Sequence, residues 1–182
     1  RHGARAHANI GGSGMQKNQG YTSPEAWWGA AANAWNCGVD GLYTFNLFPT
    51  APEIRFSRMG SPETLKGLDK LYAIDPIEPK NLWGFNRSAL VIPNRLPIAL
   101  GPSGCVQTVL PVGEDVMANV PRGKTTAVRL RLRVTGVVKG DHIVVRLNGG
   151  ETTIMTPPSP LGTAPAITWF EADMSPDQIR RG

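Results

Sequence analysis

The same helix-start signal occurs twice in the first half of the chain. Ser23-Pro24-Glu25 and Ser61-Pro62-Glu63 each combine an N-cap residue, a proline for the first helical turn and an acidic side chain. The first start leads into a nearly apolar helix that is predicted to end at Gly38, and the second into a helix predicted to end near Ile74. A helix that is apolar on most sides must be buried on most sides.

A predicted strand precedes each of these helices. Residues 4–10 alternate small apolar with polar side chains, and residues 42–47 form a short apolar run. The order strand, helix, strand, helix indicates a parallel sheet covered by helices. Only about 75 residues carry this pattern, whereas a closed eight-unit barrel takes roughly 250. The sequence therefore predicts the end of a larger α/β structure.

Charge divides the chain near residues 76–80. Residues 1–79 hold seven Lys and Arg against seven Asp and Glu, and residues 80–182 hold twelve against seven, so the net charge of +5 belongs to the second part. The Asp-Pro-Ile-Glu-Pro-Lys run at this position is typical of a linker. We therefore predict a first domain over residues 1–78 and a second over residues 79–182.

The second part has the patterns of an all-β domain. In residues 127–134, one set of side chains is apolar and the alternating set is basic: Val128, Leu130, Leu132 and Val134 against Arg129, Arg131 and Arg133. A further strand is predicted over residues 142–147, before the turn signal Asn148-Gly149. Residues 89–92 and 106–110 are shorter candidate strands. These spacings favour a β-sandwich of the jelly-roll kind.

Two stretches resemble known families. Residues 23–48 read as an Ala-rich helix, then Gly-Val-Asp-Gly, then an aromatic strand ending in Phe-Asn, and this resembles the closing units of bacterial glycoside-hydrolase-like (β/α)8 barrels. Val-Arg-Leu-Asn-Gly at residues 145–149 and Arg-Arg-Gly at the end resemble galactose-binding-like jelly rolls. The resemblance implies the last two β/α units of a TIM-type barrel followed by an accessory β-sandwich that lacks its last strand, both truncated.

The first resemblance implies a glycoside hydrolase that cleaves O-glycosidic bonds by carboxylate acid/base chemistry. In such barrels the active site lies at the carboxyl ends of the strands, where Asn9 and Asn46 are candidate ligands of sugar hydroxyls. The loop after the second strand adds Arg55 as a substrate-binding candidate and Glu53 as a weak catalytic candidate. One carboxylate does not make the required pair, so the main catalytic carboxylates are expected upstream of residue 1. Asp40 is expected to serve the turn before the strand.

A non-catalytic carbohydrate-binding or structural module is the alternative. Trp83 and Trp169 are candidate sugar platforms, although we favour core packing for each. The arginine stripe is interpreted as a solvated sheet face rather than a nucleic-acid site.

The remaining expectations concern cofactors, thiols and location. No metal or cofactor is expected, because the three histidines have no ligand cluster around them. Cys37 and Cys105 are expected to be free, buried thiols. No apolar stretch is long enough to span a membrane. No signal peptide is visible from Arg1 onward, and the resemblance implies a secreted or periplasmic protein acting on a carbohydrate substrate.

Overall fold

The computed structural model describes residues 3–10, 23–44, 56–74, 97–101, 104–118, 127–150, 152–157 and 161–179. The chain divides into two compact units, one of residues 1–114 with Gly182, and one of residues 115–181. The domain boundary predicted near residues 78–79 falls outside the described residues and stays a prediction.

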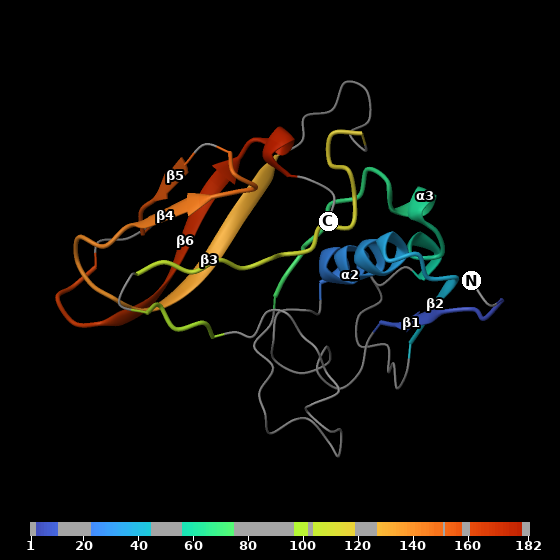
Figure 1. Ribbon diagram of the computed structural model, residues 1–182, viewed down its shortest axis with the longest axis horizontal. Coiled ribbons are helices and arrows are strands. Elements are labelled where there is room, and N and C mark those ends of the chain that lie inside the picture. The colour runs from blue at the N-terminus through green and yellow to red at the C-terminus, as the bar shows by residue number, and fades with distance from the viewer. Residues whose placement is uncertain are drawn as a thin grey trace, which may run out of the picture. The chain divides into compact units, whose positions relative to one another are not determined.

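The first unit contains a β-α-β arrangement. Strand β1 (His7–Asn9), helix α2 (Pro24–Asn36) and strand β2 (Gly41–Tyr43) follow one another, and the two strands pair in parallel with His7 opposite Gly41 (Figure 1). The backbone N–H of Ile10 donates to the carbonyl of Tyr43 at 2.9 Å and extends this pairing. The order strand, helix, strand along the chain had predicted that these two strands pair in parallel, and this prediction is confirmed.

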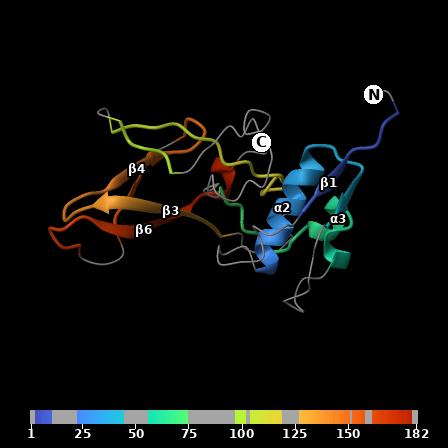
Figure 2. The ribbon, with the colours of Figure 1, turned by 90° about the horizontal axis from the view of Figure 1, so that it is seen from below.

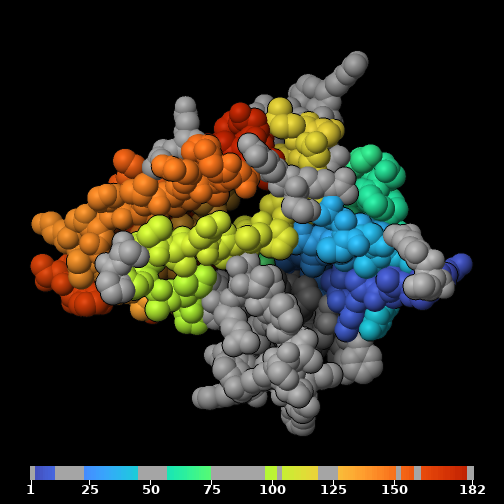
Figure 3. Space-filling view, viewed as in Figure 1, coloured from blue at the N-terminus to red at the C-terminus, as the bar shows by residue number. Residues whose placement is uncertain are grey.

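Helix α2 supplies most of the core of this unit. Ser23 caps the helix by accepting a hydrogen bond from the Ala26 N–H, as its sequence signal predicted. Trp27 and Ala31 are almost fully buried, and they pack in one apolar cluster with Ile10, Met59 and Leu65. Two views show α2 running beside β1, and the space-filling surface shows the residues of these elements side by side (Figures 2 and 3). Burial of a nearly apolar helix on several sides is thus confirmed.

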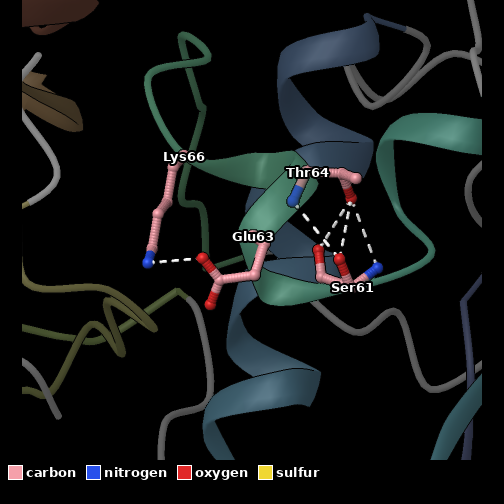
Figure 4. Close-up of polar contacts among 4 residues, drawn as sticks. All are labelled: Ser61, Glu63, Thr64 and Lys66. Atoms are coloured by element: carbon pink, nitrogen blue, oxygen red, sulfur yellow. Dashed lines mark hydrogen bonds and ion pairs between the residues drawn. The ribbon is translucent and has the colours of Figure 1, made fainter.

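The second predicted helix is much shorter than its sequence pattern indicated. Helix α3 (Pro62–Leu65) follows the 3₁₀ turn η1 (Phe56–Arg58) and begins with a capping box between Ser61 and Thr64 (Figure 4). The prediction that it continues to Ile74 is wrong. Gly67 has a φ of 70°, a left-handed conformation that ends a helix.

The second unit is built from two antiparallel strand pairs. Strand β3 (Val128–Val137) pairs with β6 (Ala166–Met174), and β4 (Ile143–Arg146) pairs with β5 (Thr152–Met155) (Figure 1). The short 3₁₀ turn η4 (Pro176–Gln178) follows β6. Asn148 and Gly149 have φ values of 50° and 75°, which confirms the turn predicted after β4.

Side chains from both pairs meet in one apolar cluster. Phe170 and Met155 are essentially inaccessible to solvent, and Leu130, Leu132 and Val134 pack against them from β3. The predicted division of β3 into an apolar face and an arginine face is therefore confirmed: its apolar side chains are partly buried and its arginines exposed.

The predicted fold class is wrong. In the described part of the chain the strands form three separate two-stranded sheets, no barrel is closed, and the second unit is not a jelly-roll-like β-sandwich. The described part of the first unit contains one β-α-β arrangement, and its second helix has only four residues. Residues 106–110, predicted as a strand of the sandwich, form no strand and belong to the first unit.

The cysteines also differ from expectation. Cys37 and Cys105 form no disulfide in the described part of the chain, as predicted, but both are exposed. Cys37 is the C-cap residue of α2, just beyond the last helical residue. The burial of the helix does not continue to this position, so the prediction of a buried thiol is wrong.

Candidate functional site

The site predicted from the sequence lies at the carboxyl edge of the β1–β2 pair. Asn9 is exposed there and is opposite Tyr43, whose residue surface is 50% exposed. Asn46, Glu53 and Arg55 lie outside the described residues, so Asn9 is the one member of this predicted barrel site that the structure locates. Within the described ranges, no group of three or more His, Cys, Asp and Glu residues could hold a metal ion.

Polar side chains share one face of this strand pair. Residues paired directly across two strands project to the same side, so His7, Asn9 and Tyr43 occupy a common face. A Cβ on Gly41 would lie 2.8 Å from His7 Nδ1, so the glycine leaves the room that the imidazole fills. Asp40 accepts a hydrogen bond from the Ala6 N–H at 2.8 Å, which agrees with the structural role predicted for it.

A second polar surface covers the outer face of the β3–β6 pair. We call it the ladder face, and its members are Arg129, Arg131, Arg133 and Thr135 on β3 with Ile167, Trp169, Glu171 and Asp173 on β6. Each of these residues lies directly opposite a member on the other strand. Side chains at every second residue of a strand project to the same face, so all eight share one face. All of them are exposed.

One end of the ladder face is neutralised by ion pairs. Arg129 Nε donates to Asp173 at 2.9 Å, and Arg131 Nε donates to Glu171 at 2.8 Å. Arg129 also lies 3.9 Å from Glu171. The hydrogen bond to Asp173, with the charge of that carboxylate, raises the pKa of Arg129 further above its ordinary value. Each carboxylate on this face is thus bound by at least one guanidinium.

The other end of the ladder face is aromatic. Trp169 is 44% exposed, and the guanidinium carbon of Arg131 lies 4.9 Å from the centroid of its ring. Arg133 lies directly opposite Trp169, and the next pair is Thr135 with Ile167, which is 57% exposed. In the described part of the chain Arg133 has no ion pair. An exposed indole therefore lies between one engaged arginine and one available arginine.

The exposure of Trp169 corrects the favoured sequence interpretation, which placed this residue in the core. The signal was present in the sequence. Along β6, Phe170 alternates with Glu171 and Asp173, and a period of two places Trp169 on the charged side. Trp83, the other candidate platform, lies outside the described residues.

The structure also reveals a partly buried polar cluster that the sequence did not indicate. Lys70 Nζ lies 2.9 Å from Glu114 Oε2, and the Tyr72 hydroxyl donates to Glu114 Oε1 at 2.9 Å. The side chains of Lys70 and Glu114 are only 3% and 15% exposed. Burial, then the charge of Glu114, raises the pKa of Tyr72 well above 10.0. Nearby, Asn33 Nδ2 donates to the Pro111 carbonyl at 3.2 Å.

These contacts hold residues 111–114 against the rest of the first unit. A Cβ on Gly113 would collide with the backbone of Ala32, so the segment lies directly against helix α2. The cluster joins residues 44 positions apart, and no local pattern could have shown it. All of its charged groups face one another, which indicates a structural clamp.

No helix in the described part of the chain is long and apolar enough to cross a membrane. Comparison of the chain with protein-family models, curated proteins and solved structures finds no match.

Proposed function

We propose that the second unit is a non-catalytic carbohydrate-binding module and that its ligand lies on the ladder face. The exposed indole of Trp169, flanked by Arg131 and Arg133, is the observation that carries this proposal. The face is a platform built on two hydrogen-bonded strands, and a strand scaffold holds side chains more rigidly than a loop does.

The chemistry of the face suits a sugar ring. A pyranose has an apolar C–H face and polar hydroxyls around its edge, so it stacks on an aromatic ring and hydrogen-bonds beside it. Trp169 supplies the ring, and the guanidinium of Arg131 lies against it in a cation–π contact. Arg133 and Thr135 supply donors along its border, since guanidinium and hydroxyl groups can both donate to sugar oxygens.

Binding fits the ladder face better than hydrolysis does. Glycoside hydrolysis commonly needs one carboxyl group as acid and a second as base or nucleophile. Glu171 and Asp173 are each held by an arginine at 2.8–2.9 Å, so both serve ion pairs. The face thus offers contacts to a ligand without a free acid/base pair.

Affinity electrophoresis through gels that contain soluble polysaccharides tests this proposal. Wild-type protein is expected to be retarded by at least one glycan, and Trp169→Ala is expected to abolish the retardation because the stacking surface is lost. Ile154→Ala is the matched control: Ile154 is 65% exposed on the outer side of the β4–β5 pair. Equal retardation of wild type and Trp169→Ala would disprove the proposal.

Glycoside hydrolysis stays a second proposal, favoured by one observation in the first unit. Asn9 and Tyr43 lie opposite each other at the carboxyl edge of a parallel strand pair, the edge at which α/β structures bind ligands. Release of nitrophenol from a panel of aryl glycosides is the test, with Glu53→Gln as the variant. If the Gln variant retains the full rate, Glu53 has no catalytic role.

A further inference from the structure

The charges of the ladder face do not balance at its aromatic end. Three arginines face two carboxylates: Glu171 binds Arg131 and Asp173 binds Arg129. Arg133 is the remaining cation, and its partner across the strands is Trp169 rather than an acid. A single unneutralised guanidinium therefore lies beside the exposed indole.

Resting on the carbohydrate-binding function proposed above, we infer that the ligand is an acidic glycan, in which a uronic acid ring stacks on Trp169 and its carboxylate binds Arg133. Residues directly opposite in an antiparallel pair have Cβ atoms about 5 Å apart. The carboxyl group of a uronic acid is attached directly to the ring, so a ring on the indole holds it within reach of the guanidinium. The planar guanidinium then binds the carboxylate through two parallel N–H donors.

The other arginines of the face fit this role less well. Arg131 already bonds Glu171 and covers part of the Trp169 ring, and Arg129 is shared between two carboxylates. Binding an external anion there would first require breaking an existing pair. Arg133 needs no such exchange.

The same balance disfavours a nucleic acid as the ligand. A phosphate backbone presents charges at regular intervals, and proteins that bind it neutralise several of them with Lys and Arg. Only one of the three ladder arginines is available, because the other two are neutralised on the protein. One cation beside one aromatic ring suits a ligand held by a single stacked ring and a single carboxylate, rather than one held through several phosphates.

A matched pair of polysaccharides separates this inference from the function on which it rests. Polygalacturonate and its methyl ester have the same sugar ring, and only the first carries the charge. Affinity electrophoresis of the full chain is expected to show about threefold tighter binding to polygalacturonate, because an exposed charge pair contributes about 0.7 kcal/mol. Arg133→Gln is expected to reduce this preference to about onefold and leave binding of the ester unchanged.

Arg146→Gln is the control for overall charge, since Arg146 is exposed on the β4–β5 pair and the substitution removes the same charge. It is expected to keep the preference. If both arginine variants lose the preference for polygalacturonate equally, the inference is overturned. Equal affinity of the wild type for the two polymers would also overturn it, but would leave the proposed function standing. Retardation by neither polymer overturns the inference, and retardation by no glycan at all disproves the proposed function. Tighter, Arg133-dependent binding of an oligothymidylate would identify a nucleic acid instead.

Discussion

Glu63 and Glu114 each pair with a lysine, but in different surroundings. Glu63 on helix α3 pairs with Lys66, the residue that follows the helix (Figure 4). The two atoms lie 2.6 Å apart, and the side chains are 73% and 51% exposed. Glu114 lies 2.9 Å from Lys70 with both side chains largely withdrawn from water. A buried charge that loses its partner remains desolvated, whereas an exposed one is stabilised by water.

Removing the carboxylate should therefore have unequal consequences at the two sites. Glu114→Gln is expected to lower the free energy of unfolding by about 3 kcal/mol, because Lys70 is left buried without a counter-charge. Glu63→Gln, the matched control, is expected to change it by less than about 0.5 kcal/mol. Urea unfolding followed by circular dichroism measures both, and equal losses would contradict the clamp role of Glu114.

At the scale of the element, helix α2 depends on one position without a side chain. A Cβ on Gly29 would overlap the carbonyl oxygen of Leu71, so the backbone of residue 71 lies directly on the helix. The Leu71 N–H also donates to the Glu25 carbonyl at 2.9 Å. The segment after α3 is thus held to α2 by backbone contact.

Gly29→Ala is predicted to destabilise the protein although alanine is the better helix former. The steric cost should exceed the gain of about 1 kcal/mol in helix propensity, because the obstructing atoms belong to a backbone. Gly60→Ala is the control, since a Cβ there would meet only the Ser57 carbonyl, at 3.9 Å. A higher thermal midpoint for Gly29→Ala than for wild type would show that the two segments separate easily.

Strand β6 has two faces that should respond differently to substitution. Phe170→Ala removes a side chain with no exposed surface, and the expected loss is about 4 kcal/mol. Asp173→Asn breaks an exposed ion pair with Arg129, and the expected loss is below about 1 kcal/mol. Chemical denaturation compares the two; a larger effect of Asp173→Asn would mean that the ladder face, and not the apolar cluster, stabilises this strand pair.

Elements were predictable where neighbouring residues determine them. The cap at Ser23, the alternation along β3 and the turn at Asn148 all depend on residues a few positions apart, and each was predicted correctly. Helix α3 was predicted too long because the leucine spacing continues past Gly67, while its left-handed backbone ends the helix. Apolar spacing alone does not report such a stop.

At the scale of the whole molecule, the sequence patterns did not determine how many units assemble. A β-α-β sequence pattern predicts one pair of parallel strands. The same pattern occurs in an isolated β-α-β arrangement and in a closed barrel, so it does not tell the two apart. The clamp of Lys70, Tyr72 and Glu114 was equally hidden, since contacts between distant residues have no local signature. The arginine stripe was visible, but only the pairing of β3 with β6 shows which arginine is left without an acid.

Stability of the molecule at alkaline pH should depend on Tyr72. The pKa of Tyr72 is raised in the folded state above the value of 10.0 expected in the unfolded chain. Below about pH 10 both states keep the proton and the free energy of unfolding is unaffected. Above about pH 10 only the unfolded chain releases the proton, so the free energy of unfolding falls as the pH rises. The added loss approaches about 1.4 kcal/mol per pH unit.

Tyr72→Phe tests this dependence. The variant loses a hydrogen bond and is expected to be less stable by about 1 kcal/mol at neutral pH, but its unfolding free energy should fall less steeply between about pH 10 and 11.5. Lys70 is present in both proteins, so the difference in slope reports Tyr72. Tyr43→Phe is the control, because Tyr43 is 50% exposed. Parallel slopes for wild type and Tyr72→Phe would contradict the prediction.

The buried pair of Glu114 with Lys70 also has a mechanical consequence. The second unit begins at Asp115, the residue that directly follows Glu114 along the chain. A tension applied to the chain beyond residue 115 therefore reaches the first unit through Glu114 before it reaches helix α2. The ion pair, the Tyr72 hydrogen bond and the backbone of residue 113 against α2 would resist such a pull together.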